Sequence, residues 1–165
     1  MGTPKTKWAL AVLLFVFASG ALFAEEPKNP AVDKGPPIEL ATRLIYGTNH
    51  KAELVDPQLA RLIETLKKDF GYLNYDVKKS EKATLKFDET ATQDLGDDII
   101  FIVRNLGFYK EQRKVWLELW FRGKKIFGAF SLFPKPAKPL LIKGPNTNEG
   151  TYIIMLALVG DEEVK

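Results

Sequence analysis

The apolar positions of this chain repeat at two spacings, and each spacing predicts one kind of element. From residue 38 to 47 the apolar side chains follow a period of two, which predicts a strand because successive side chains of a strand point to opposite faces. From residue 59 to 70 the period is 3.6, and the apolar positions form a single helical stripe made of Leu59, Leu62, Ile63, Leu66 and Phe70.

Both ends of the predicted helix carry sequence signals. Asp56 is a favoured N-cap residue, and Pro57 follows at the first helical position, where its missing N–H costs nothing. Gly71 supplies the residue that ends a helix in the left-handed conformation. We therefore predict one amphipathic helix of about four turns between Asp56 and Phe70.

The remaining apolar patterns predict strands, over residues 72–77, 83–87, 98–104, 114–133 (a hairpin), 140–143 and 151–159. Residues 98–104 and 151–159 are apolar on both faces, as in central strands. The prediction is an α+β fold, with the N-terminal amphipathic helix packed on a mostly antiparallel sheet of about six or seven strands. Folding of this sheet into a sandwich is left open.

The hairpin has two different faces. With Gly123 and Lys124 as a type II′ loop, Phe121 pairs with Ile126, and one face of the hairpin is wholly apolar. The other face carries Trp116, Trp120, Phe127 and Phe133, bordered by Glu118, Arg122 and Lys125. If the helix covers the apolar face, the aromatic face is left to meet a partner, whereas a second layer of strands would bury it in a core.

Residues 1–24 have the three parts of a secretory signal peptide, namely a basic start, an apolar run over residues 8–18 and small residues up to Ala24. Because a membrane-spanning helix needs roughly 20 apolar residues, we predict cleavage after Ala21 or Ala24 and no membrane span afterwards. The chain is then exported to the periplasm, the cell surface or the medium. The Pro-rich residues 25–37 are predicted as a flexible spacer, residues 38–160 as a single domain and residues 161–165 as a charged tail.

The charge balance and the cysteine content exclude several classes of function. The chain has 24 Lys and Arg against 21 Asp and Glu, and the loss of Lys5 and Lys7 with the signal leaves 22 against 21. A chain so nearly balanced has no long-range field to attract nucleic acid, so we predict no nucleic-acid partner. The sequence contains no cysteine, which excludes disulfides, thiolate metal sites and a cysteine nucleophile.

Three segments contain residue types that could support chemistry, but none is predicted to hold a catalytic residue, a cofactor or a metal. His50, the only histidine, lies in a polar stretch typical of an exposed loop. The acidic residues from Asp88 to Asp98 lack the spacing of a calcium-binding loop and are predicted as a solvated loop. Residues 144–151 lack the lysine of a phosphate-binding loop and are predicted as a hairpin loop.

Several local motifs resemble a family of small exported bacterial proteins of unknown function. They are the strand end Leu44-Ile-Tyr-Gly-Thr-Asn49, the Val-Asp-Pro helix start, the Tyr72 to Val77 exit strand and a Gly-rich loop before an apolar last strand. The resemblance covers about residues 40–159. It implies a bacterial envelope setting and transfers no functional residue.

These observations favour an exported, non-enzymatic interaction module that contacts a protein or another component of the cell envelope. The predicted partner-binding residues are Trp116, Trp120, Phe127 and Arg122. One alternative is a small-ligand or glycan-binding domain, with the ligand between helix and sheet or on the aromatic face. The other is a hydrolase that uses Asp and Glu side chains.

Overall fold

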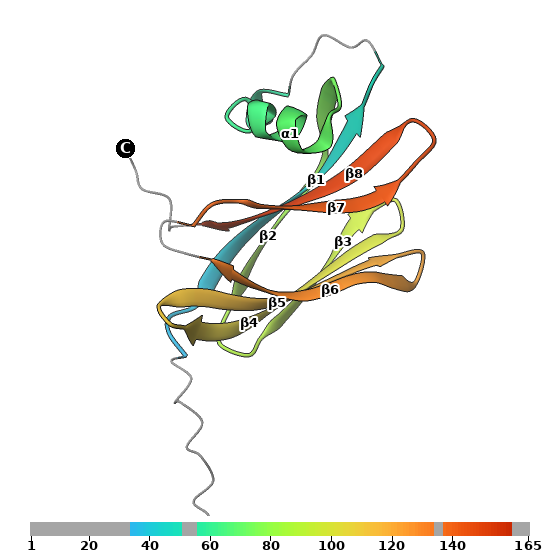
Figure 1. Cartoon of the computed structure of the whole chain (residues 1–165). Helices are drawn as coiled ribbons and strands as arrows, with labels where there is room; N and C mark the ends of the chain where they lie inside the picture. The colour runs from blue at the N-terminus through green and yellow to red at the C-terminus, as the bar shows by residue number, and fades with distance from the viewer. Residues whose placement is uncertain (1–33, 51–55, 134–136, 160–165) are drawn as a thin grey trace, which may run out of the picture. The chain divides into compact units, whose positions relative to one another are not determined.

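The chain folds into two antiparallel four-stranded sheets and one short helix (Figure 1). The computed structural model describes residues 34–50, 56–133 and 137–159; the predicted signal peptide, most of the predicted spacer and the charged tail lie outside them. The first sheet has the order β2-β1-β8-β7 and the second β3-β4-β5-β6. The strands are β1 (Ile38–Thr48), β2 (Asn74–Leu85), β3 (Thr90–Gly96), β4 (Ile99–Tyr109), β5 (Gln112–Phe121), β6 (Lys124–Phe133), β7 (Leu140–Asn146) and β8 (Gly150–Val159).

One hydrophobic core joins the two sheets. Its buried side chains come from the first sheet (Ile38, Leu40, Leu44, Leu85, Ile142, Ile154, Leu156 and Leu158) and from the second (Leu95, Ile99, Phe101, Val103, Val115, Leu117, Leu119 and Phe133). The predicted antiparallel, β-rich character is confirmed. The prediction of one helix on a single sheet of six or seven strands is wrong, because eight strands form two sheets whose apolar faces cover each other.

The helical segment begins and ends where the sequence predicts. The Asp56 carboxylate accepts a hydrogen bond from the backbone N–H of Gln58 at 2.8 Å, and Gly71 ends the segment in the left-handed conformation with φ 75°. Between these ends the helix is not continuous. A 3₁₀ turn, η1 (Pro57–Leu59), precedes α1 (Ile63–Phe70), and the N–H of Leu62 donates to the carbonyl of Leu59 only three residues back.

The helix packs on the outer face of the first sheet and not on the hairpin. Leu59 and Leu66 are buried there with Ile45, Tyr75, Ile153 and Met155. The buried Tyr75 hydroxyl ties the two layers together by donating to the Leu66 carbonyl at 2.7 Å. β8 is therefore covered by the core on one face and by helical residues on the other, which explains why its sequence is apolar on both. The expectation that the helix covers the apolar face of the hairpin is wrong, since the first sheet covers that face.

The β5–β6 hairpin forms in a different register from the predicted one. Its loop residues are Arg122 and Gly123, both with positive φ (49° and 70°), so the turn is of type I′ and not the predicted type II′. A bulge after the first two pairs then absorbs one residue of β6, and Trp116 pairs with Phe130. Beyond the bulge the register differs by one residue from the prediction, and such a shift exchanges the two faces of a strand.

The acidic segment of residues 88–98 is not a loop. It contains β3 between two tight turns, and Asp88, Asp97 and Asp98 have positive φ values of 66°, 52° and 60°. Residues 144–151 do join two strands as predicted, since β7 and β8 pair on both sides of a turn. Of the helical segments that the structure describes, none combines the length and apolarity needed to cross a bilayer.

On each side of the two sheets, an edge strand of the first sheet lies near an edge strand of the second. β6 and β7 are the edge strands on one side, and residues 134–139 join them; β2 and β3 are the edge strands on the other side (Figure 1). Each sheet therefore has two strands that, within the described residues, form a ladder on one side only.

Candidate interaction surface

The outer face of the second sheet carries an aromatic surface. Exposed hydrophobic side chains concentrate there: of the seven large ones among the described residues, five belong to β4 and β6, namely Ile100, Tyr109, Ile126, Phe130 and Leu132. Trp116 and Trp120 of β5 lie on the same outer face and are half-buried. We call Ile100, Trp116, Glu118, Trp120 and Phe130 the aromatic face.

Strand pairing places these side chains in adjacent rows. Ile100 of β4 pairs with Trp120, and Trp116 pairs with Phe130 of β6. The rings of Trp116 and Phe130 meet edge to face, with centroids 4.6 Å apart, and the Phe130 side chain is 60 % exposed. The Lys114 ammonium lies over the Phe130 ring, 4.6 Å from its centroid. The surface is therefore an ordered set of ring contacts.

Glu118 stands between the two tryptophans and holds both. Its two carboxylate oxygens accept hydrogen bonds from the indole N–H of Trp116 at 2.9 Å and of Trp120 at 3.0 Å. The Lys125 ammonium forms an ion pair with the same carboxylate at 2.5 Å. Gly128, opposite Glu118 on β6, leaves the room for this, since a methyl group there would stand 2.7 Å from Cε of Lys125.

These contacts lower the pKa of Glu118 to about 2, first through the hydrogen bond from Lys125 and then through those from the indoles of Trp116 and Trp120. The carboxylate is ionised at neutral pH, and its side chain is 19 % exposed. Such a group is a poor general acid, because it holds its proton only in strong acid. Its role in this geometry is to hold the two indoles in place.

We expect Glu118→Gln to lower stability at neutral pH and to lose this effect in acid. The ionised Glu118 stabilises the folded state above the ordinary carboxyl pKa near 4.5, and this contribution disappears as the pH falls toward about 2. Urea denaturation of both proteins from pH 7 to pH 3 measures the difference. Lys125→Gln removes the main cause of the lowered Glu118 pKa and should make the stability depend less on pH. A wild-type advantage that stays constant over this range would contradict the assignment.

The predicted partner-binding residues do not all lie together. Trp116 and Trp120 share the aromatic face, but Phe127 pairs with Leu119 and packs against the core, so its predicted place beside the tryptophans is wrong. Phe133 is likewise buried in the core. Arg122 lies exposed in the hairpin turn, where its Nε is 3.8 Å from the Asp98 carboxylate.

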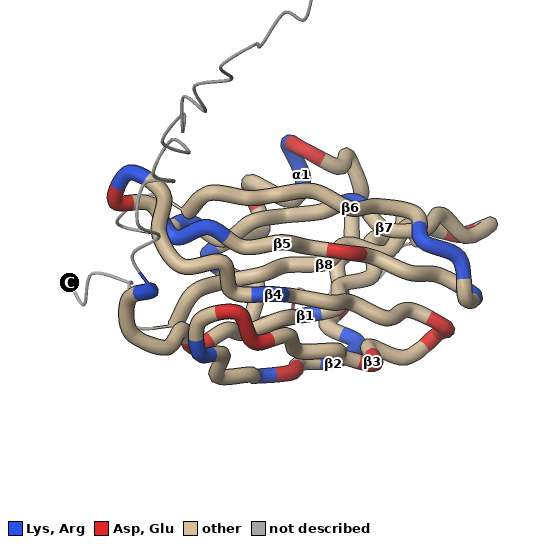
Figure 2. The backbone as a smooth tube through the Cα atoms, turned by 90° about the horizontal axis from the view of Figure 1, so that it is seen from below, with Lys and Arg blue, Asp and Glu red and all other residues tan. Residues whose placement is uncertain are grey.

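Two members of the aromatic face, Ile100 and Phe130, were missed from the sequence. The signal for Ile100 was present, because residues 98–104 are apolar on both faces and one of those faces looks outward. Phe130 was assigned to the core side by the predicted register. Figure 2 looks toward this sheet and shows basic positions at the hairpin turn, where β6 begins, and acidic positions beside β3.

In the other candidate segments, the described polar side chains form single pairs and not a catalytic group. His50 is exposed, and its Nε2 lies 3.8 Å from the equally exposed Glu149 carboxylate. The carboxylates around β3 are engaged singly: Asp88 pairs with Arg104 at 2.6 Å, and Asp97 accepts from the Tyr152 hydroxyl at 2.7 Å. Within residues 34–50, 56–133 and 137–159, no group of three or more His, Cys, Asp or Glu side chains is placed to hold a metal ion.

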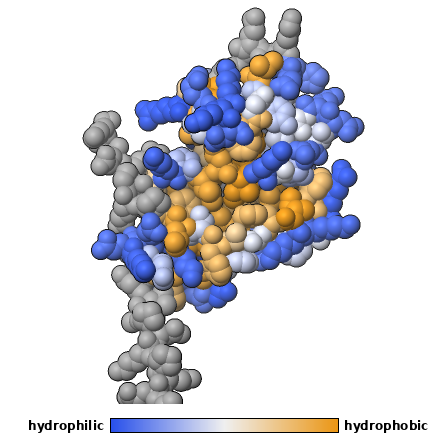
Figure 3. All heavy atoms as spheres, viewed as in Figure 1, coloured by the Kyte–Doolittle hydropathy of each residue, from blue (hydrophilic) through white to orange (hydrophobic). Residues whose placement is uncertain are grey.

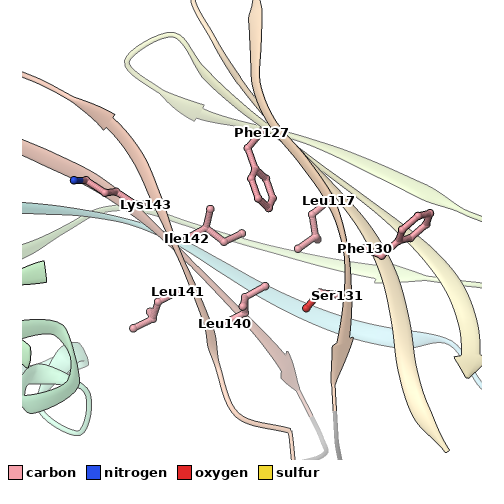
Figure 4. Close-up of a pocket in the computed structure, with 8 residues that line it drawn as sticks. All are labelled: Leu117, Phe127, Phe130, Ser131, Leu140, Leu141, Ile142 and Lys143. Carbon is pink, nitrogen blue, oxygen red and sulfur yellow. The ribbon is translucent and has the colours of Figure 1, made fainter. Parts of the chain in front are cut away.

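A shallow apolar groove lies beside the aromatic face, between the edge strands β6 and β7. It has a volume of about 450 Å³, and Figure 4 shows its lining residues Leu117, Phe127, Phe130, Ser131, Leu140, Leu141, Ile142 and Lys143. Figure 3 shows a hydrophobic area on the side of the molecule where these two strands lie. Because Phe130 lines the groove and also belongs to the aromatic face, the two apolar surfaces are continuous.

Comparisons with protein-family models, with curated proteins and with solved structures found no match. The resemblance to small exported bacterial proteins therefore stays a prediction from sequence motifs.

Proposed function

We propose that the chain is an exported, non-enzymatic interaction module that binds a partner protein of the cell envelope through the aromatic face. One observation carries this proposal. Trp116 and Trp120 lie on an outer sheet face with both indole N–H groups bonded to one ionised carboxylate, beside an exposed Phe130.

The arrangement suits binding because it is ordered before a partner arrives. Glu118 fixes both indoles, so little side-chain freedom remains to be lost on association. Tryptophan is also among the residues that contribute most to protein interfaces, chiefly where it is surrounded by groups that exclude water. Ile100 and Phe130 extend the apolar area on both sides of β5, as a central interface patch requires.

Export belongs to the proposal through residues 1–24, which lie outside the described residues. The composition of this segment is that of a cleavable signal, and it supports a periplasmic, cell-surface or extracellular location. A periplasmic or cell-surface location favours a partner in the cell envelope. The intact mass of the protein recovered from outside the cytoplasm tests the export step, because cleavage after Ala21 and cleavage after Ala24 leave chains of different mass.

Photo-crosslinking tests the aromatic face directly. A benzoyl-phenylalanine at position 130 is compared with one at position 73, because Phe130 and Leu73 are equally exposed at 60 % and Leu73 lies outside the second sheet. We expect a discrete crosslinked protein from position 130 alone. Unlabelled wild-type chain and Leu73→Ser should compete for it, whereas Phe130→Ser should not.

Two results would overturn the proposal. Equal crosslinking from both positions would mean that the aromatic face has no special role. Retention of the chain on purified envelope polysaccharide, lost in Phe130→Ser, would instead identify a glycan as the ligand, because flat aromatic side chains also stack on sugar rings.

A second candidate function, the binding of a small ligand between helix and sheet, is favoured by a pocket. It lies between η1 and the outer face of the first sheet and has a volume of about 590 Å³. This volume falls in the range of roughly 300–1,000 Å³ that is common for ligand sites.

A further inference from the structure

The pocket beside η1 has an apolar floor formed by small side chains of the first sheet. The helical segment covers the part of the outer face around Ile45 and Ile153, whereas Ala41 of β1 and Ala157 of β8, which pair with each other, lie at the border of this covered area. Because these side chains are short, a hollow remains over them. Its lining consists of Ala41, Arg43, Pro57, Gln58, Ala60, Arg61, Leu62, Lys82, Pro139, Met155, Ala157, Leu158 and Val159.

The charge of this lining has a single sign. Arg43, Arg61 and Lys82 line the pocket, and no Asp or Glu among the described residues does so. Within the same described residues, none of these three cations forms an ion pair with a carboxylate. Glu39, the next outward-facing position of β1 beyond Ala41, stands outside the lining.

One of the cations is held in place. The Arg43 guanidinium donates to the Gln58 carbonyl of η1 at 3.3 Å, which joins the floor of the pocket to its wall. A guanidinium has five N–H donors in a planar fork, so this bond leaves donors for a ligand. A carboxylate or phosphate fits such a fork, and its negative charge would balance the cations around it.

We infer that this pocket binds a single-chain anionic amphiphile, with its carboxylate or phosphate at Arg43, Arg61 and Lys82 and its apolar chain on Ala41, Met155 and Ala157. The inference rests on the second candidate function and is independent of the aromatic face. A cationic ligand is repelled by the three like charges, and a neutral one leaves them without a counter-charge.

Three ten-carbon probes separate the contributions of head group and chain: decanoate, decanol and decyltrimethylammonium. Binding to the full chain is followed through the ¹³C-methyl signal of Met155, which lines the pocket and is one of only two methionines in the sequence. We expect decanoate to shift this signal and to bind roughly tenfold more tightly than decanol, the equivalent of one hydrogen bond to a charged group. Decyltrimethylammonium should leave the signal unchanged.

Two variants locate the head and the chain. Arg61 is exposed, so Arg61→Gln should not disturb folding; it should weaken decanoate several-fold and leave decanol unchanged. Ala157→Leu fills the floor and should weaken both probes. Circular dichroism confirms that each variant folds.

The possible failures are distinguishable. Equal binding of decanoate and decanol, insensitive to Arg61→Gln, would overturn the anionic assignment but leave a ligand pocket. No Met155 shift with any probe would overturn the small-ligand function itself. Sedimentation of the chain with phosphatidylglycerol vesicles but not phosphatidylcholine vesicles, without a decanoate shift, would assign the cations to a lipid surface and overturn the pocket inference. None of these results bears on crosslinking through position 130.

Discussion

Replacing Phe101 by alanine is expected to destabilise the fold by about 4 kcal/mol, within the range typical of buried phenylalanine. Phe101 lies on β4, is fully buried, and belongs to the core that the two sheets share. Its removal leaves a cavity between the sheets, since packed strands on both sides cannot collapse into the space. Chemical denaturation followed by tryptophan fluorescence measures the loss.

The adjacent residue is the matched control. Ile100 lies on the same strand but faces outward and is 39 % exposed, so Ile100→Ala should cost less than about 1 kcal/mol. If both substitutions cost the same, Phe101 would not lie between two sheets, and the sandwich would be wrong.

Gly150→Ala is expected to destabilise the fold by about 3 kcal/mol, the upper end of typical overpacking costs. Gly150 begins β8 opposite Thr48, and a methyl group on it would stand 2.1 Å from the carbonyl oxygen of Gly47. The obstructing atom belongs to the backbone of β1, so no side chain can rotate away. The two strands must separate locally, with loss of hydrogen bonds at this end of the ladder between β1 and β8. The shift in the urea midpoint measures the cost.

Gly71 is the control, because a substitution there is opposed by backbone conformation and not by a steric clash. Its φ is 75°, but nothing lies within 4 Å of where a methyl group would stand. Gly71→Ala should therefore cost about 1 kcal/mol, the penalty for a left-handed alanine. A Gly150→Ala cost no larger than this would show that β1 and β8 do not approach as closely as described.

Local signals in the sequence predicted local structure well. The cap at Asp56, the stop at Gly71 and the alternation of β1 all depend on residues close in the chain, and the structure confirms each of them. The structure confirms that β4 and β8 are inner strands of their sheets. Only β8 is buried on both faces, because the outer face of β4 carries the exposed Ile100.

Long-range arrangement was not predictable in the same way. An alternating strand shows that one face is covered but not what covers it, so the apolar face of the hairpin was matched to the helix when the first sheet covers it. The type of the hairpin turn was predicted wrongly for a related reason. Gly123 is compatible with a Gly123–Lys124 loop and with an Arg122–Gly123 loop. The second loop is supported by a tertiary contact, the hydrogen bond from the Arg122 N–H to the Asp98 carbonyl at 3.0 Å.

The candidate site was predicted in part. Trp116 and Trp120 share a face because they lie four residues apart on one strand, which needs no knowledge of the register. Their neighbours on β6 depend on the bulge, and so Phe127 was chosen where Phe130 lies. The contact of Glu118 with both indoles depends on rotamers that no sequence pattern reports.

The two edge strands on the side of residues 134–139 differ in how they discourage intermolecular pairing. β7 contains Lys143 and Pro145 and departs from regular register beside them, and proline lacks the N–H that a new neighbour would need. In β6 the eight residues from Ile126 to Phe133 include no proline and no charge. A neighbouring polypeptide can therefore extend the second sheet at β6 but not the first sheet at β7. On this side of the molecule, growth into larger β-structures is thus directed to the second sheet.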